Sequence, residues 1–403
     1  MSGPLTAALR PLGLVPASWS HLRSHHRPGA GISALYRVEA VPRSANRAQQ
    51  PLRLQVGATT ASLSADQHRN TVRGAVDDTV MRLWVHPRDP VLSGLTWATS
   101  PGAVARNLFG AEEGGARAAL KLVAYRPLRR AVIRARFNGV TAYLKVPQPR
   151  LASELRRRLE LAASAGLPVP PLLPVRAGAG PDVDAVLALG SLPGRNLHQE
   201  LREGSAAALD PGVLTGLLAG LPGEALAFPR RPAWSERVLD YAAGAAVALP
   251  EAADRIIRCA RETDEAVRSA VPGPVVPTHG DFHGGNLLAV SGQGGLQLSG
   301  MLDVDSLGPG YRVDDLACFL GHLYVFAALN PRHDGLRRAA ERFADAFAAD
   351  TDPAALYSRS AAVALTLVAG ASGQGSRGGE RALATAEELL ARSRNFLTAG
   401  RKG

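Results

Sequence analysis

The alternation of hydrophobic and polar residues is clearest between residues 119 and 165. Three short segments alternate and are rich in β-branched and aromatic residues, as half-buried strands are: Leu120–Tyr125, Ala131–Arg136 and Val140–Val146. The dipeptide Asn138-Gly139 separates the last two and favours a two-residue hairpin turn. Apolar residues then recur at spacings of four and three, which predicts a helix over residues 151–165. The pattern therefore predicts an antiparallel sheet followed by an amphipathic helix.

The first 110 residues predict a smaller mixed unit. Alternating or apolar runs indicate strands at Ile32–Val38, Leu52–Val56 and Val80–Val85. We expect a short helix over Gln67–Val76 and a second helix from Pro101 to Leu108, preceded by Ser100 as its N-cap.

Beyond residue 192 the pattern is mainly helical. A short apolar strand, Ala185–Leu189, and a glycine-containing turn precede this region. Apolar residues at helical spacing then predict helices at Val213–Leu218, Trp234–Ala246, Glu251–Ala270, Cys318–Leu329, Leu336–Ala349, Pro353–Ala369 and Arg381–Leu397. We expect Gly370–Gly379 to be a flexible loop between the last two. The chain thus divides into three parts, residues 1–110, 111–192 and 193–403.

Composition describes a globular protein. The chain has 403 residues, 46% of them hydrophobic and 20% charged, which suffices for several compact units. Its only cysteines, Cys259 and Cys318, indicate a reducing compartment, and we expect a cytoplasmic protein. No run of 18 apolar residues predicts a membrane span, and the first residues do not resemble a secretory signal.

Positive charge is concentrated in the first part of the chain. Residues 1–150 carry 21 of the 46 Lys and Arg residues but only 7 of the 35 acidic ones. The whole chain has a net charge of +11. A nucleic-acid groove requires basic residues interleaved with aromatic ones, or a recognised module, and neither stands out. We therefore expect a small-molecule partner and no nucleic acid. A basic nucleotide-binding part and a mildly acidic substrate-binding part explain the split equally well.

Candidate chemistry lies between residues 278 and 317. Asp281 precedes two apolar runs, Leu287–Val290 and Leu296–Leu302, which a glycine-rich segment separates, and this pattern predicts a β-hairpin. Asn286 and Asp303 flank the hairpin and would meet at one end of it. A carboxylate that orients a hydroxyl, together with an amide oxygen and a carboxylate that hold magnesium on phosphates, suits phosphoryl transfer.

At these residues the chain resembles the aminoglycoside phosphotransferase and choline kinase superfamily, small-molecule kinases with a protein-kinase-like fold. HGDFHGGN, residues 279–286, is similar to the HGDxxxxN loop of that family, and LDVDSLGPGYRVDDLA, residues 302–317, is similar to its metal-binding segment. The resemblance extends from about residue 120 onward. It implies that Asp281 is the catalytic base, that Asn286 and Asp303 bind Mg²⁺, and that Asp315 supports the loop.

The same resemblance implies a bilobal α+β fold. Residues 111–192 would form an antiparallel-sheet N-lobe that binds nucleotide, residues 193–403 a mainly helical C-lobe with the catalytic loop and substrate site, and residues 1–110 an additional α+β extension or cap. ATP and Mg²⁺ are the implied cofactors.

Lys145 and Glu154 are the candidate nucleotide-binding residues. The chain has 43 Arg and only three Lys residues, so a lysine inside the third predicted strand is informative. Lysine reaches the α- and β-phosphates as a point charge, although Lys145 could also be an edge lysine facing solvent. Glu154 borders the apolar stripe of its helix and matches the family's spacing better than Glu160. The alternative for Glu154 is a surface carboxylate paired with Arg157 or Arg158.

Four further features concern the same candidate site. The turn that would cover the phosphates, Arg126–Arg130, contains no glycine, which weakens a protein-kinase interpretation more than a small-molecule kinase interpretation. We expect His279 to brace the loop by hydrogen bonding. Asp305 would contact a second metal or act structurally, and His283 would approach a phosphate or cap the loop.

These observations predict an ATP-dependent phosphotransferase that transfers the γ-phosphate to a hydroxyl of a small molecule, such as a sugar, polyol or amino alcohol. One alternative is a non-catalytic nucleotide-binding relative that acts through a partner; the intact set of candidate residues favours the enzyme. The other is an aminoglycoside-modifying or antibiotic-modifying kinase. A cationic drug requires a dense acidic pocket, and the acids at Glu236–Asp240 and Asp264-Glu265 are sparse. We expect a neutral or anionic acceptor; its identity, the choice of ATP over GTP and the oligomeric state stay open.

Overall fold

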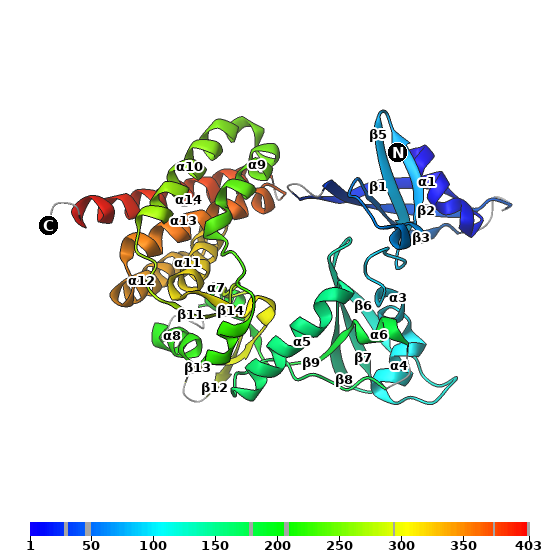
Figure 1. Cartoon of the computed structure of the whole chain (residues 1–403), viewed down its shortest axis with the longest axis horizontal. Helices are drawn as coiled ribbons and strands as arrows, with labels where there is room; N and C mark the ends of the chain where they lie inside the picture. Colours follow the sequence, from blue (N-terminus) through cyan, green and yellow to red (C-terminus); the bar gives the residue numbers. More distant parts are fainter. Residues whose placement is uncertain are drawn as a thin grey trace. The chain divides into compact units, whose positions relative to one another are not determined.

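The computed structural model describes residues 1–27, 31–44, 50–176, 180–204, 209–292, 295–373 and 375–400. Contacts divide the chain into two units, Met1–Arg156 with Pro171–Ser191 and Arg157–Pro170 with Leu192–Gly403. The first unit is built on antiparallel sheets and the second is mainly helical (Figure 1). The predicted α+β fold, with an antiparallel-sheet N-lobe and a helical C-lobe, is confirmed. The three-part division at residues 110 and 192 stays a prediction.

The first unit begins with a five-stranded antiparallel sheet in the order β1-β2-β3-β5-β4. Its strands are β1 (Leu14–Arg27), β2 (Gly31–Pro42), β3 (Leu52–Thr59), β4 (Val72–Val76) and β5 (Thr79–Val85). Helix α1 (Ser2–Leu9) packs on one face, where Leu5 and Leu9 join Val38 and Val56 in a buried cluster. A 3₁₀ turn, Arg10–Leu12, leads from this helix into the sheet.

Two features of this sheet differ from the prediction. The predicted helix over residues 67–76 is wrong beyond His68, because α2 (Ala65–His68) is a single turn and β4 pairs with β5 through a tight turn at Asp77, where φ is 49°. Strand β1 was not predicted, because its sequence is polar and it lies at the sheet edge, where many of its side chains are exposed.

A second antiparallel sheet, in the order β6-β7-β8-β9, contains the three strands predicted most clearly. They are β6 (Ala119–Arg126), β7 (Arg130–Phe137) and β8 (Val140–Pro147), joined by β9 (Leu187–Gly190). Asn138 and Gly139 have φ values of 46° and 80°, as the primed hairpin turn requires. Helix α5 (Pro149–Ser164) follows β8, as predicted, and contributes to both units.

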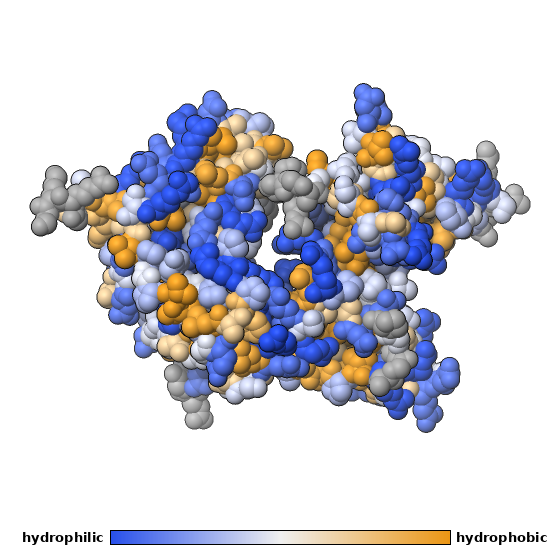
Figure 2. All heavy atoms as spheres, viewed as in Figure 1, coloured by the Kyte–Doolittle hydropathy of each residue, from blue (hydrophilic) through white to orange (hydrophobic). Residues whose placement is uncertain are grey.

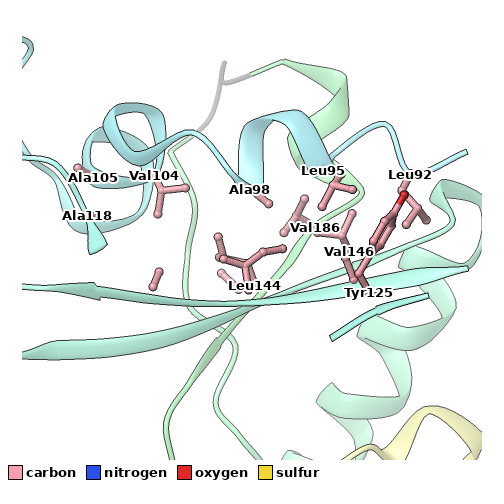
Figure 3. Packing of buried hydrophobic residues seen from close by; sticks show 14 of the residues in the cluster. Leu92, Leu95, Ala98, Val104, Ala105, Ala118, Tyr125, Leu144, Val146 and Val186 are labelled. Atoms are coloured by element: carbon pink, nitrogen blue, oxygen red, sulfur yellow. The ribbon is translucent and has the colours of Figure 1, made fainter. Parts of the chain in front are cut away.

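Short helices cover one face of this sheet. They are α3 (Leu95–Ala98) and α4 (Pro101–Phe109), with α6 (Pro181–Asp184) before β9. Figure 3 shows Leu144 and Val146 of the sheet beneath Leu95 and Ala98 of α3, with Tyr125 directed toward Leu92. These side chains form one buried cluster, so the segment that precedes β6 is part of the core of this second sheet.

The second unit consists mainly of helices packed around α13 (Pro353–Ser372), which contacts α9, α10, α11 and α14. The other helices are α7 (Leu197–Arg202), α8 (Pro211–Ala219), α9 (Val238–Ala248), α10 (Ala253–Ser269), α11 (Arg312–Leu329), α12 (Asp334–Asp350) and α14 (Ser376–Gly400). In the described part of the chain, α13 alone is long and apolar enough to cross a membrane, and 78% of that stretch is buried, as is typical of a core helix.

The expected flexible loop at Gly370–Gly379 is wrong for most of its length, because α13 continues to Ser372 and α14 begins at Ser376. Packing of α13 against α14 stabilises helix ends that glycine content alone disfavours. On the face shown in Figure 2, hydrophobic residues lie in separate patches among hydrophilic ones.

Two small sheets position the candidate loop. Strands β10 (Arg195–Asn196), β12 (Leu287–Gly292) and β13 (Gly295–Met301) form one sheet, and β11 (Val275–Thr278) pairs with β14 (Gly308–Tyr311) in the other. Residues 279–286 connect β11 to β12, so both ends of the loop are held by paired strands.

Candidate functional site

The loop at residues 279–286 is fastened to helix α11 by a buried carboxylate. Asp315, which is 0% exposed, accepts hydrogen bonds from the backbone N–H of His279 at 2.7 Å and of Gly280 at 2.8 Å. Burial raises the pKa of Asp315 to about 6. The two hydrogen bonds favour the charged form and so oppose this rise. This is the supporting contact that the family resemblance implied.

Gly280 and His279 set the path of the loop. Gly280 has a φ of 79°, and a Cβ there would lie 2.6 Å from the side chain of Ser306, so this turn requires glycine. Nδ1 of His279 accepts from the backbone N–H of Asp281 at 3.2 Å, so its other nitrogen, Nε2, carries the proton and donates to the Leu302 carbonyl at 2.9 Å. His279 therefore braces the loop, as predicted.

The carboxylate of Asp281 is held at both oxygens. Trp234 Nε1 donates to Oδ1 at 3.1 Å, and Asn286 Nδ2 donates to Oδ2 at 3.2 Å and to the Asp281 carbonyl at 2.9 Å. The Asp281 side chain is 25% exposed, so a bound molecule can still reach it. The side-chain nitrogen of Asn286 faces Asp281. The side-chain oxygen of Asn286, Oδ1, is therefore the atom that can bind a cation.

The predicted hairpin is confirmed. Leu287 of β12 pairs with Met301 of β13, and the Leu302 N–H donates to the Asn286 carbonyl at 2.7 Å. Asp303 is the next residue and adopts a left-handed conformation, with φ of 59°, which aspartate tolerates better than most residues. The hairpin therefore returns Asp303 to the end at which Asn286 lies.

Asn286 and Asp303 suit magnesium in their chemistry. Both offer hard oxygen donors, and Mg²⁺ in kinase sites commonly uses one or two protein ligands together with waters and substrate phosphates. Over the described ranges, no group of three or more His, Cys, Asp or Glu side chains is arranged to hold a metal ion. The donor set therefore fits Mg²⁺ bound with phosphates better than a metal enclosed by the protein.

Arg158, one of the two arginines considered as a surface partner of Glu154, is buried and does not lie at the surface. The side chain is 0% exposed, and it donates from Nε to the Leu307 carbonyl at 2.9 Å and from Nη1 to the Asp305 carbonyl at 2.8 Å. Arg158 thus holds the segment that follows Asp303. Its position in helical register with the apolar stripe of α5 was the available signal.

His283, within the loop, stacks with two further imidazoles. The ring of His283 is 4.2 Å from that of His322 and 5.9 Å from that of His198, with interplanar angles of 11° and 25°. Burial lowers the pKa of His283 to about 4 and that of His198 to about 3, so both rings are neutral at pH 7. His283 Nε2 lies 3.9 Å from the Asp281 carboxylate, and because the ring is neutral this contact is not an ion pair.

The candidate nucleotide-binding residues belong to the other unit. Lys145 lies on β8 between Val132 of β7 and Leu187 of β9 and is 8% exposed, which does not fit an edge lysine facing solvent. Glu154 lies on α5 and is half-buried. The roles expected for both residues, and the meeting of both units on one nucleotide, stay predictions.

The glycine-free turn between β6 and β7 is held by side chains. Leu128, with φ of 63°, donates its N–H to Asp89 at 2.9 Å, and its carbonyl accepts from Gln148 at 2.7 Å. Asp89 also accepts from the hydroxyl of Tyr125 at 2.7 Å. These hydrogen bonds fix the conformation of the turn, whereas a glycine-rich turn would be free to adopt several conformations.

Comparison of the sequence with protein-family models shows the family to which this chain belongs. A model of the phosphotransferase enzyme family matches residues 117–357, more than half of the chain. No curated protein matches the sequence.

Similar solved structures include a thermostable mutant of aminoglycoside phosphotransferase APH(4)-Ia with AMP-PNP and hygromycin B (12% identity, TM-score 0.46, covering 73% of this chain and 98% of that one). Choline kinase from Cryptosporidium parvum is another (10% identity, TM-score 0.43, covering 77% and 96%). A choline/ethanolamine kinase family protein from Mesorhizobium loti is a third (18% identity, TM-score 0.41, covering 74% and 97%). At these identities and TM-scores the likenesses carry no argument about activity.

Proposed function

Because this chain belongs to the phosphotransferase enzyme family and is a small-molecule phosphotransferase, we propose that it transfers the γ-phosphate of ATP to a hydroxyl of its acceptor. The observation that supports this proposal most directly is the bonded pair of Asp281 and Asn286, with Asp303 returned to the same end of the hairpin. One carboxylate is fixed in orientation, and two oxygen donors beside it are suited to a cation.

Asp281 has two tasks in the proposed reaction. It orients the acceptor hydroxyl in line with the γ-phosphorus, and it takes the hydroxyl proton as the acceptor oxygen bonds to phosphorus and the bond to the β,γ-bridging oxygen breaks. The bonds from Trp234 and Asn286 hold this carboxylate before the acceptor arrives, so little reorganisation is needed.

Magnesium, when bound, neutralises charge on the phosphates, and Asn286 and Asp303 are the residues that would hold it. Lys145 would reach the α- and β-phosphates, with Glu154 as its partner. We also propose a reducing, cytoplasmic environment, in which the two buried cysteines stay unpaired.

The test compares Asp281→Asn with the wild-type enzyme. We expect ATP with Mg²⁺ to raise the melting temperature of both proteins, because the variant keeps the cation ligands, while ADP release with a panel of acceptors falls by at least about 100-fold in the variant. Asp345→Asn, at an exposed position on α12, is the matched control and should leave turnover unchanged. Turnover retained by Asp281→Asn would remove this residue from its proposed role.

A further inference from the structure

The turn between β6 and β7, Arg126–Arg130, contains a residue in an unfavourable backbone conformation. The Arg129 N–H donates to the Arg126 carbonyl at 3.0 Å and closes the turn. Leu128 is its third residue and has a φ of 63°, for which glycine is the usual residue. Such a conformation persists only where the surroundings fix it, and it is most frequent at functional sites. Three of the five residues of this turn are arginines, a residue type that suits phosphates.

Asp89, in the segment that follows β5, fixes the turn through the Leu128 N–H. The carboxylate is 4% exposed, and its Oδ2 accepts from the Leu128 N–H at 2.9 Å and from the Tyr125 hydroxyl at 2.7 Å. Its Oδ1 accepts from the N–H groups of Val91 at 2.9 Å and of Leu92 at 3.1 Å. Figure 3 shows Tyr125 beside Leu92. Because four donors converge on this carboxylate, its position is fixed, and with it that of the Leu128 N–H.

The five-stranded sheet takes part in the same network. The indole of Trp84, on β5, is 2% exposed, and its Nε1 donates to the Tyr125 hydroxyl at 3.0 Å. This indole lies against β3, where a Cβ on Gly57 would lie 2.3 Å from its ring. The ring of His86 lies 5.1 Å from that of Tyr125. The Tyr125 hydroxyl accepts from Trp84 and donates to Asp89, so it connects the five-stranded sheet to the residue that fixes the turn.

The other backbone group of Leu128 is held from the strand that carries Lys145. Gln148, directly after β8, donates from Nε2 to the Leu128 carbonyl at 2.7 Å. Lys145 lies opposite Val132 of β7, and Val132 follows Arg130 by two residues. The turn and Lys145 therefore lie at the same end of this sheet, roughly 7 Å apart along the strand direction. A phosphate chain held by Lys145 is within reach of the turn.

We propose that Asp89 and Gln148 position the turn Arg126–Arg130 for contact with the nucleotide phosphates, and that the five-stranded sheet is thereby part of the nucleotide-binding machinery. The proposal rests on the proposed phosphotransferase function. Both residues act through Leu128 and are positioning residues. Because they hold the turn before the nucleotide arrives, binding does not have to order it.

The test uses the full chain with two variants. Asp89→Asn keeps the size of the side chain but replaces one acceptor oxygen with an NH₂ group, so the four donors can no longer all be satisfied. Gln148→Met removes the donor to the Leu128 carbonyl at similar volume. Competition against a fluorescent ADP gives the Kd of AMP-PNP with Mg²⁺ and the Kd of adenosine, which lacks phosphates. Val38→Ala is the control, because it removes volume from the separate buried cluster beside α1.

We expect Asp89→Asn to raise the Kd of AMP-PNP by about 10-fold and Gln148→Met to raise it by about 3-fold or more, because each variant loses a hydrogen bond that fixes the turn. The Kd of adenosine should stay within about 2-fold in both variants, since adenosine does not reach the turn. Val38→Ala should lower the melting temperature and leave both Kd values within about 2-fold. A purely structural role for Asp89 predicts the pattern of this control.

An unchanged Kd of AMP-PNP in both variants would overturn the proposal, as would an equal loss of affinity for AMP-PNP and adenosine. Either result leaves the phosphotransferase function intact, because the wild type still binds nucleotide. If the wild type binds neither fluorescent ADP nor AMP-PNP, the nucleotide site and this inference fail together. If Asp89→Asn does not fold, Gln148→Met decides by the same comparison.

Discussion

Acid should destabilise this protein through His198, a half-buried imidazole on helix α7. The ring lies between Phe326, at 4.9 Å, and His283, at 5.9 Å, and its Nε2 has no hydrogen-bond partner among the described residues. A Cβ on Gly284 would lie 2.4 Å from this ring, so the imidazole packs closely against the backbone of that residue. Burial, and then the neighbouring imidazoles, lower its pKa from 6.5 to about 3.

The sign and size of the effect follow from linkage. The unfolded chain takes up a proton on His198 near pH 6.5, whereas the folded protein resists protonation until about pH 3, so stability is lost as the pH falls through this window. At pH 5 the unfolded state gains about 2 kcal/mol from this proton, and the full shift corresponds to about 5 kcal/mol. Asp315 acts in the opposite direction, because its raised pKa favours the folded state as it becomes protonated below about pH 6.

The variant His198→Gln isolates the contribution of His198 to the loss of stability in acid, because every other titratable group is present in both proteins. Urea denaturation at pH 7.5 and pH 5 gives the free energy of unfolding, and the quantity to compare is its change between the two pH values. We expect the wild type to lose about 2 kcal/mol more than the variant. His333→Gln, at an exposed histidine, should not alter the wild-type loss. Equal losses in wild type and His198→Gln would show that this ring titrates normally in the folded protein and refute the reasoning.

Three further perturbations test other parts of the molecule. Tyr125→Phe removes the hydroxyl that donates to buried Asp89 and should cost about 1–3 kcal/mol in urea denaturation; an unchanged midpoint would contradict this network. Arg359→Met leaves the Asp314 carboxylate buried without its cation and should cost about 3–5 kcal/mol, part of which the double variant with Asp314→Asn recovers. Equal losses in the single and double variants would mean that the charge of Asp314 is not the cause. Lys145→Met should raise KM for ATP by about 10-fold or more and leave acceptor KM unchanged, and an unaltered KM for ATP would exclude a phosphate contact.

Much of the local architecture follows from the sequence. The alternation over residues 119–146 and the Asn138-Gly139 turn determine β6, β7 and β8, because strand pairing and turn type depend on neighbours along the chain. The hairpin between Asn286 and Asp303 is equally local, since its turn and paired runs lie within one short segment. The family motif could therefore be located, and with it the residues now proposed as base and cation ligands.

Other features depend on tertiary packing. The polar edge strand β1 acquires its extended conformation from pairing with β2. Its own sequence has no hydrophobic periodicity that would predict a strand. The glycine-rich ends of α13 and α14 stay helical because the two helices pack together.

The sequence by itself determined which residues we propose for phosphoryl-transfer chemistry, because they occur at fixed short spacings around a hairpin. Only the tertiary structure decided what surrounds them. Trp234 donates to Asp281, Arg158 donates to the carbonyl of Asp305, and His198 stacks with His283. These side chains come from helices and turns far along the chain. Their contacts depend on how those elements pack against one another, and hydrophobic periodicity shows which face of an element is buried without showing which polar group it meets.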